Sequence, residues 1–260
     1  MNDKLDIAVL QSPGELDGSD KRLDWLNTQF HKHDIAGSDL LILPELFQCG
    51  YNTPDTIARV AEPSDGPFAQ QIRHLAKTHD LAIAYGYAER TKAGLYNSAQ
   101  CIDKRGQTVG HHRKLLLPPG FEPSIFIPGQ GYEVFKLGEF RLSILICYDI
   151  EFPENMRHVA AAGAELVIAP TALAKEWGVV SEKLIPTRAF ENGVFVAYAN
   201  HCGFEIGKEY YGGSCIVAPD GHELARADNL ACISRASITK SGVQDAQMRM
   251  PYLTERFRLP

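Results

Sequence analysis

The sequence predicts an α/β protein in which two layered β-sheets are covered by helices on the outside. Short apolar runs alternate with amphipathic stretches along most of the 260 residues, as they do where strands and helices alternate. This alternation of predicted strands and helices starts again after residue 146. The two halves also resemble each other, since LLILPEL matches LVIAPTA and LAIAYGYA matches VFVAYANH. No Gly/Ser-rich linker separates them. We therefore expect one domain, 1–260, with an internal pseudo-repeat and a C-terminal tail from about 242 to 260.

In the first half of the chain, apolar side chains recur at helical spacing over residues 20–36 and 66–79. Gly37 is a typical stop for the first of these predicted helices. A turn-rich segment, DKRGQ, joins two runs that predict a hairpin. The strands expected in this half are 6–10, 40–43, 81–87, 96–102 and 108–114.

The second half opens with a strong apolar run, RLSILI, over residues 141–146. Pro153 suits the first turn of a helix that extends to about residue 162. A helix is also expected over 181–192, with Pro186 inside it. The remaining predicted strands are 165–169, 194–199 and shorter ones near 214–218, 222–226 and 230–238. The last eighteen or so residues show no clear pattern.

Composition and charge exclude several classes of protein. Apolar residues make up 45% and charged residues 22%, which argues against a disordered chain, and a net charge of −6 disfavours a general binder of nucleic acid or anionic membranes. No apolar run approaches the length of a membrane span, and the opening MNDKLDIAVLQ lacks the features of a secretory signal. Six cysteines without a CxxC pair indicate reduced thiols. We therefore expect a cytoplasmic protein without a metal site.

Three reactive side chains stand at the ends of predicted strands, where rigid scaffolds present functional groups to a cleft. Glu45 follows LLILP, Lys114 ends the second hairpin strand, and Cys147 ends RLSILI. Each has an ordinary alternative. Cys147 could be a packing thiol, Glu45 a carboxylate at a helix start, and Lys114 one member of the solvated basic run 111–114. The loop after Cys147 could likewise be a solvated acidic turn.

Taken together, the motifs around these residues resemble those of the nitrilase superfamily, the carbon–nitrogen hydrolases. The family signatures are a Glu in a strand–Pro–Glu turn, a Lys after a basic strand, and a Cys in a Cys-x-Asp-x-x-Phe-Pro-Glu run. The resemblance covers almost the whole chain, with the motifs in the expected order. They are LILPELFQCGYN (41–52), HHRKLLLPPGFE (111–122), ILICYDIEFPEN (144–155), RAFENGVFVAYAN (188–200) and YGGSCIVAPDG (211–221).

The resemblance implies a four-layer αββα sandwich and a Glu–Lys–Cys triad that needs neither metal nor organic cofactor. In this sequence the implied nucleophile is Cys147, the general base Glu45 and the cationic stabiliser Lys114. Glu122 matches a further Glu that orients the Lys or the substrate. Family members usually pair, so a homodimer or a higher homo-oligomer is expected.

The physical chemistry of these groups agrees with the implied roles. A free thiol is only slightly ionised at neutral pH, so Lys114 would favour the thiolate and then face the oxyanion. The backbone N–H of Tyr148 is a plausible second donor. Tyr51 and Phe121 are expected to line the pocket.

Position 151 narrows the substrate class. Family members that handle carboxylate-bearing amides often carry Arg where this chain has Glu151, and a carboxylate would attract an ammonium instead. The sequence is similar to that of bacterial amidases acting on amino-amides such as 5-aminopentanamide. We therefore expect an amidase that acts on a small, amine-bearing aliphatic amide. A carbamoyl-amine hydrolase, a nitrilase or a non-catalytic binding relative remain alternatives, and Glu151 could instead pair with a neighbour such as Arg157.

Overall fold

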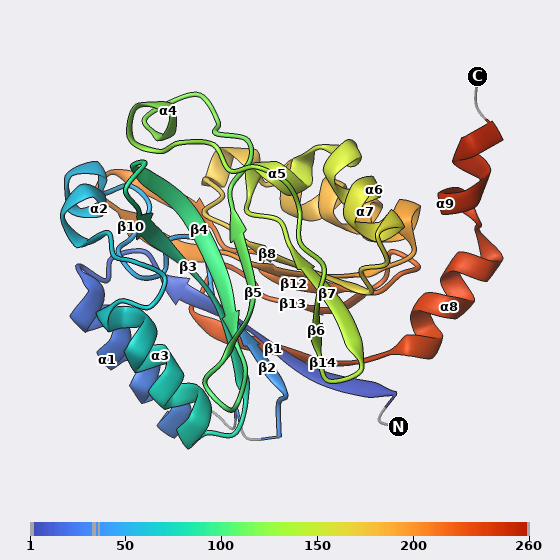
Figure 1. The fold of residues 1–260 in the computed structure, drawn as a ribbon, viewed down its shortest axis with the longest axis horizontal. Helices are drawn as coiled ribbons and strands as arrows, with labels where there is room; N and C mark the ends of the chain where they lie inside the picture. Colours follow the sequence, from blue (N-terminus) through green and yellow to red (C-terminus); the bar gives the residue numbers. More distant parts are fainter. Residues whose placement is uncertain (1–2, 33–34, 36, 259–260) are drawn as a thin grey trace.

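The computed structural model describes residues 3–32, 35 and 37–258. Two β-sheets pack face to face, and helices cover the outer face of each, which gives the αββα order of layers (Figure 1). The predicted fold class is confirmed. Among the residues that the structure describes, none of the helices combines the length and the apolar character of a membrane span.

The first sheet has eight strands and combines the N-terminal half with late segments of the chain. Its order is β11-β10-β1-β2-β3-β4-β5, and β14 pairs with β1 antiparallel in addition. The strands are β1 (Lys4–Pro13), β2 (Leu40–Ile42), β3 (Ala82–Arg90), β4 (Leu95–Ile102), β5 (Thr108–Arg113), β10 (His201–Glu205), β11 (Lys208–Tyr211) and β14 (Cys232–Thr239).

The second sheet has six strands in the order β13-β12-β9-β8-β7-β6. These are β6 (Phe135–Leu137), β7 (Phe140–Ile144), β8 (Leu166–Pro170), β9 (Phe195–Ala199), β12 (Cys215–Val217) and β13 (Glu223–Arg226). In both sheets three parallel strands are followed by two antiparallel ones: β1-β2-β3-β4-β5 in the first and β7-β8-β9-β12-β13 in the second. This shared pattern is the structural form of the pseudo-repeat.

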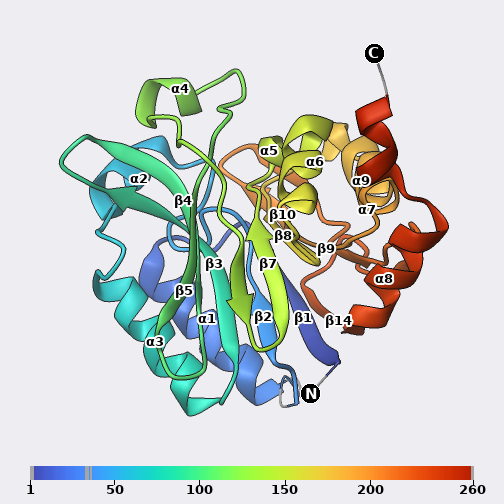
Figure 2. The same cartoon turned by 45° about the vertical axis from the view of Figure 1, so that its right-hand side comes forward.

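The core between the sheets is built from the inward-facing apolar side chains of both. Leu5, Ile7 and Val9 of β1 meet Leu142 and Ile144 of β7 in one buried cluster. Opposite faces of the same strands pack against helices, as the period of two along a strand requires. Both views place α1 and α3 on the first sheet and α6 and α7 on the second (Figures 1 and 2). These helices are α1 (Ser19–Lys32), α3 (Pro67–Thr78), α6 (Pro153–Ala161) and α7 (Ile185–Asn192).

Several boundaries differ from the predicted ones for identifiable reasons. The helix expected over 20–36 ends at Lys32, and residues 33, 34 and 36 lie outside the described part of the chain. The helix expected over 181–192 has a wider π-type turn, Val180–Leu184, before α7. Pro186 has no N–H to donate to the preceding turn, which interrupts the regular ladder. Short helices α2 (Pro54–Val60), α4 (Glu122–Ile125) and α5 (Tyr148–Glu151) were not predicted.

The C-terminal segment is helical, contrary to the absence of a pattern in its sequence. Thr239 caps α8 (Lys240–Arg249) by accepting a hydrogen bond from the N–H of Gly242, and α9 (Tyr252–Glu255) follows. Only Val243 and Ala246 of α8 are buried. An apolar stripe this short does not produce a readable helical period.

Candidate active site

Three of the predicted site residues form one buried cluster of charges. Glu45 follows β2, Lys114 follows β5, and Glu122 begins α4. The Nζ of Lys114 donates to Oε1 of Glu45 at 2.7 Å and to Oε1 of Glu122 at 2.6 Å. All three side chains are buried. An ammonium has three N–H donors, so one donor of Lys114 remains for another acceptor.

Cys147 follows β7 with an unusual backbone conformation. Its φ is +46° and its ψ is −105°, and its N–H donates to the carbonyl oxygen of Pro170 at 2.9 Å. A residue other than glycine with positive φ carries strain of about 1–3 kcal/mol, which the surrounding structure must hold in place. The turn presents the thiol to a hollow of about 410 Å³, whose lining also includes Tyr51, Tyr148 and Glu151.

The charges of the cluster set the proton affinity of each member. Burial lowers the pKa of Lys114, but Glu45 and Glu122 raise it more, so its pKa lies well above the ordinary value and the amine stays charged. Burial and Glu122 raise the pKa of Glu45 against the opposing effect of Lys114. Burial and Glu45 raise the pKa of Cys147 well above its ordinary value, although Lys114 lowers it.

The resting thiol is therefore protonated. We expected Lys114 to favour the thiolate, and it does act in that direction, but burial outweighs it. A protonated thiol needs a nearby base to become a nucleophile.

Glu45 has one carboxylate oxygen available for that proton. Its Oε1 accepts from Lys114 and also from Nδ2 of Asn97 at 2.7 Å, whereas the buried Oε2 has no hydrogen-bond partner among the described residues. A buried oxygen without a partner is costly, which makes it a strong acceptor for an incoming proton. Asn97 also donates to Oε2 of Glu122 at 3.3 Å, so it holds both acids.

Asn97 was missed at the sequence level, although a signal was present. It is one of three buried polar residues inside β4, and buried polar groups need a hydrogen-bond partner. The Glu45 turn is held in two further ways. The Nε2 of His201 lies 2.8 Å from the carbonyl oxygen of Glu45, and Gly86 of β3 lies beneath the turn. A Cβ at Gly86 would be 2.8 Å from Cα of Glu45, so only glycine allows this approach.

Tyr51 connects the charge cluster to the hollow. Its hydroxyl donates to Oε1 of Glu122 at 2.6 Å, and its N–H donates to Oε2 of Glu205 at 3.0 Å. Glu205 is held in turn by the buried Arg22 at 3.0 Å. Phe121 packs edge-on against the Tyr51 ring, with centroids 5.1 Å apart. We expected both residues to line the pocket, but only Tyr51 lies in the lining of the hollow.

Asp149 joins the segment that carries Lys114 to the turn that carries Cys147. Its carboxylate accepts from the N–H groups of Leu115 at 3.0 Å and Leu116 at 2.9 Å, and from Ile146 at 3.3 Å. The Nε2 of His112 lies 2.9 Å from it. Both Asp149 and His112 are buried, so neither the acidic turn nor the basic run is simply a solvated face.

We expect Asp149→Asn to lower kcat at least tenfold with little change in KM, because an amide group cannot accept from every N–H that the carboxylate receives. Hydrogen bonds to a charged group are worth about 1.5–3 kcal/mol each, so stability should fall as well. Steady-state kinetics well below the melting temperature separates these effects.

Asp103→Asn is the matched control for this variant. Asp103 is also buried and accepts from the N–H groups of Arg105 and Gln107, but it lies in the β4–β5 turn. It should lose stability without losing kcat. Equal kcat values in the two variants would show that Asp149 does not position the groups of the site.

Glu151 is half-buried and lines the hollow with Cys147. The suggested pairing with Arg157 is wrong, because Nη1 of Arg157 donates to the backbone oxygen of Glu191 at 2.6 Å. Burial raises the pKa of Glu151 to about 6, against the opposing effects of Lys114 and Arg188. Its carboxylate makes no ion pair or hydrogen bond to a side chain in the part of the chain that the structure describes.

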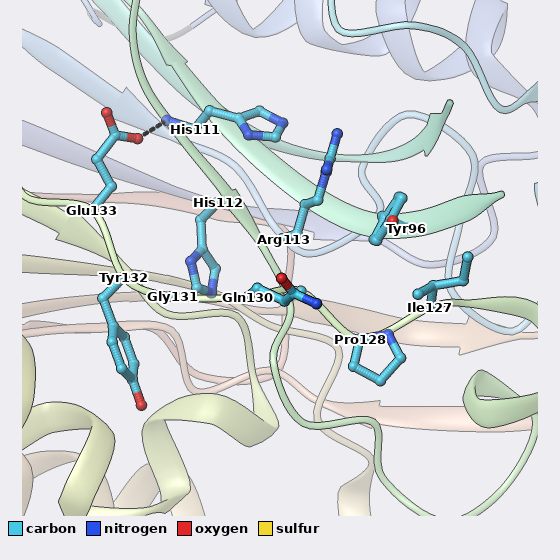
Figure 3. Close-up of a pocket in the computed structure, with 11 residues that line it drawn as sticks. Tyr96, His111, His112, Arg113, Ile127, Pro128, Gln130, Gly131, Tyr132 and Glu133 are labelled. Carbon is cyan, nitrogen blue, oxygen red and sulfur yellow. Dashed lines mark hydrogen bonds between the residues drawn. The ribbon is translucent and has the colours of Figure 1, made fainter. Parts of the chain in front are cut away.

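A second hollow, of about 560 Å³, lies beside β5 and the segment 127–133 (Figure 3). Several of its charged and polar groups already have partners. Arg113 pairs with Glu89 at 2.6 Å, and the N–H of His111 donates to Oε2 of Glu133 at 2.9 Å. None of the described cysteines, serines or threonines lines it. Among the described residues no group of three or more His, Cys, Asp or Glu side chains is arranged to hold a metal ion.

The comparison with protein families decides the identity of the fold and of its chemistry. The model of the carbon-nitrogen hydrolase family matches residues 7–248. The chain belongs to this family. A curated relative described as "Hydrolase in pqqF 5'region", from Pseudomonas protegens, is 41% identical over 96% of this chain and 88% of its own length. An (R)-stereoselective amidase from Pseudomonas sp. is 34% identical over 73% of this chain and 69% of its own length.

Solved structures give the same result for the fold. The amidase from Nesterenkonia sp. AN1, as a double mutant in complex with acrylamide, superposes with a TM-score of 0.86 and 30% identity. The match covers 99% of this chain and 98% of that one. The predicted membership of the nitrilase superfamily is confirmed, and this carbon–nitrogen hydrolase is an enzyme that cleaves non-peptide carbon–nitrogen bonds.

Proposed function

We propose that this carbon–nitrogen hydrolase converts a small, amine-bearing aliphatic amide to a carboxylic acid and ammonia through a thioester on Cys147. The observation that supports this most is the unpartnered Oε2 of Glu45 in the same cluster as the ammonium of Lys114. The Nesterenkonia amidase has also been crystallised with acrylamide and with butyramide, which are short aliphatic amides.

In the first half-reaction, Sγ of Cys147 attacks the amide carbon as Glu45 takes the thiol proton on Oε2. The carbonyl oxygen becomes an oxyanion, which accepts from the third N–H of Lys114 and from the backbone N–H of Tyr148. As the tetrahedral intermediate collapses, the C–N bond breaks. Glu45 then returns its proton to the leaving nitrogen, which departs as ammonia.

In the second half-reaction, Glu45 takes a proton from water, and the hydroxide attacks the thioester carbon. The same donors hold the second oxyanion. Collapse breaks the C–S bond, and the sulfur regains its proton from Glu45. Glu122 shares Lys114 with Glu45 and accepts from Tyr51, so it keeps the ammonium aimed at the reacting carbon.

Ammonia release across a panel of amides, carbamoyl-amines and nitriles tests the reaction class. We expect the amides to be the fastest substrates. Faster turnover of carbamoyl-amines or nitriles would replace the amidase proposal by another reaction of the same family. No turnover, together with an unreactive Cys147 in thiol-trapping mass spectrometry, would favour a binding relative.

Glu151 supports the amine-bearing class, since it is a carboxylate without a partner in the wall beside Cys147. We expect amine-bearing amides to exceed carboxylate-bearing ones of equal length by about ten- to a hundredfold in kcat/KM at neutral pH. The estimate combines an attraction and a repulsion of roughly 1 kcal/mol each. Glu151→Arg should narrow or invert the ratio. The difference should shrink at high salt, because screening weakens exposed charges.

The preference should also depend on pH in a defined direction. A carboxyl group with a pKa of about 6 is ionised above that pH and neutral below it. The advantage of the amine-bearing amide should therefore be full near pH 7.5 and decline as the pH falls through 6. A ratio that is equal in wild type and Glu151→Arg at both pH values would place Glu151 outside substrate binding and leave the amidase proposal intact.

A further inference from the structure

Lys208 is an unpaired cation in the wall of the hollow that contains Cys147. It begins β11, is half-buried and lines the hollow. Its Nζ lies 5.2 Å from the centre of the Tyr51 ring. The acids on its own hairpin have other cations, since Glu205 pairs with Arg22 and Glu209 pairs with Lys175 at 2.7 Å. Within residues 3–32, 35 and 37–258, Lys208 forms no ion pair.

The β10–β11 hairpin holds Lys208 firmly against the site. Glu205, three residues earlier, accepts from the N–H of Tyr51 at 3.0 Å and from the N–H of Asn52 at 2.7 Å. It also accepts from the hydroxyl of Tyr210. The hairpin and the Tyr51 turn therefore form one unit, and a cation on this hairpin has a fixed place relative to the hollow.

Glu151 supplies the opposite charge in the same hollow. Neither Glu151 nor Lys208 has an ion-pair partner in the described chain, and they do not form an ion pair with each other. Both side chains are half-buried and face the same hollow, so a ligand that carries the two opposite charges can pair with each of them. From this juxtaposition of Lys208 and Glu151, we infer that the preferred substrate is a zwitterionic amide. Glu151 binds its ammonium, and Lys208 binds its carboxylate.

This inference rests on the proposed amidase function and adds a second recognition element to it. Glu151 alone predicts rejection of every carboxylate-bearing amide, whereas Lys208 predicts acceptance of those that also carry an amine. The length of the substrate is limited by Tyr51. Lys114 and Lys208 place their Nζ atoms 5.8 Å and 5.2 Å from the centre of this one ring, so the two nitrogens are at most about 11 Å apart. A short aliphatic chain covers that distance.

Four amides allow the effect of each substrate charge on the kinetics to be measured separately. Butyramide carries neither charge, 5-aminopentanamide an ammonium, the monoamide of glutaric acid a carboxylate, and glutamine both. Glutamine is used as each enantiomer, because the pocket is chiral. Ammonia release gives kcat and KM for wild type, Lys208→Met and Glu151→Gln at low and high salt.

We expect wild type to favour one glutamine enantiomer over the glutaric monoamide. Lys208→Met should raise KM for the glutaric monoamide and for glutamine about five- to tenfold more than for butyramide, with kcat changed less than twofold. Glu151→Gln should have the matching effect on 5-aminopentanamide and glutamine. Both effects should shrink at high salt.

Lys136→Met is the matched control. Lys136 is an exposed lysine on β6 that does not line the hollow, and its loss removes the same charge. It should leave kcat and KM unchanged for all four amides.

Two failures can be told apart. If wild type hydrolyses none of the amides, butyramide included, the proposed function fails. If wild type hydrolyses butyramide but rejects both enantiomers of glutamine, the inference is wrong while the amidase function stands. It is equally wrong if Lys208→Met changes the KM of all four amides by the same factor, because Lys208 then acts only as a support for the Tyr51 ring.

Discussion

Replacing Cys147 by alanine is expected to abolish ammonia release and leave the fold intact. The variant removes the sulfur that would form the thioester, and no neighbouring group in the hollow can replace it. The residue keeps its Cβ, so the strained turn at φ +46° faces the same steric demand before and after the change. Ammonia release and circular dichroism on the same sample test both halves of the expectation.

Cys101→Ala is the control, because this thiol is fully buried in the core between the sheets and away from the hollow. It should cost about 1 kcal/mol or more of stability through the cavity it leaves, and retain kcat. Near-normal activity in Cys147→Ala would show that the nucleophile lies elsewhere.

Lys114→Met is expected to have the second-largest effect on activity. Loss of one oxyanion donor costs about 2.7–4 kcal/mol in the transition state, or a hundred- to a thousandfold in kcat, with a smaller change in KM. Single-turnover measurement of thioester formation isolates this step. A variant with unchanged kcat and only a raised KM would make Lys114 a binding residue.

The same variant is expected to be much less stable, because two buried carboxylates lose their cation. Removing one partner of a buried pair costs about 3–5 kcal/mol. Without Lys114, the pKa of Glu45 should rise further above its ordinary value. When the pKa of a carboxyl group is higher in the folded state than in the unfolded state, the folded protein is most stable with that group protonated. The free energy of unfolding of the variant should therefore fall as the pH rises.

The double variant Lys114→Met/Glu122→Gln keeps the kinetic prediction testable. It removes one positive and one negative charge, and it should therefore fold better than the single variant. If the double variant regained wild-type kcat, the loss in the single variant would be due to misfolding and not to a missing oxyanion donor.

The sequence could predict the sheets and the central cluster because both depend on local signals. Buried strands are apolar runs, and Glu45 and Lys114 stand at the ends of such runs. The motifs that carry them also resemble a known family. The sequence could not predict that Asn97 holds two acids, because that contact joins segments far apart in the chain. Burial raises the pKa of Cys147 more than Lys114 lowers it. This burial also depends on segments far apart in the chain, so the sequence could not predict it.

The charges of the hollow were only half predictable. Glu151 is four residues after Cys147, so its nearness follows from the chain itself. Lys208 reaches the hollow through a hairpin that belongs to the opposite sheet, and its neighbours in sequence gave no sign of this. The single domain over 1–260 and the homo-oligomer stay predictions.

The cluster lies across the seam between the two sheets, and this has a consequence for folding. Glu45 and Lys114 follow strands of the eight-stranded sheet, whereas Cys147 follows a strand of the six-stranded one. Neither sheet alone brings acid, ammonium and thiol together. A partly folded chain with only one sheet formed has no reactive centre, however complete its hydrogen-bond ladder is. The thiol therefore meets its base only when the two sheets have packed together, which requires contacts between segments far apart in the chain.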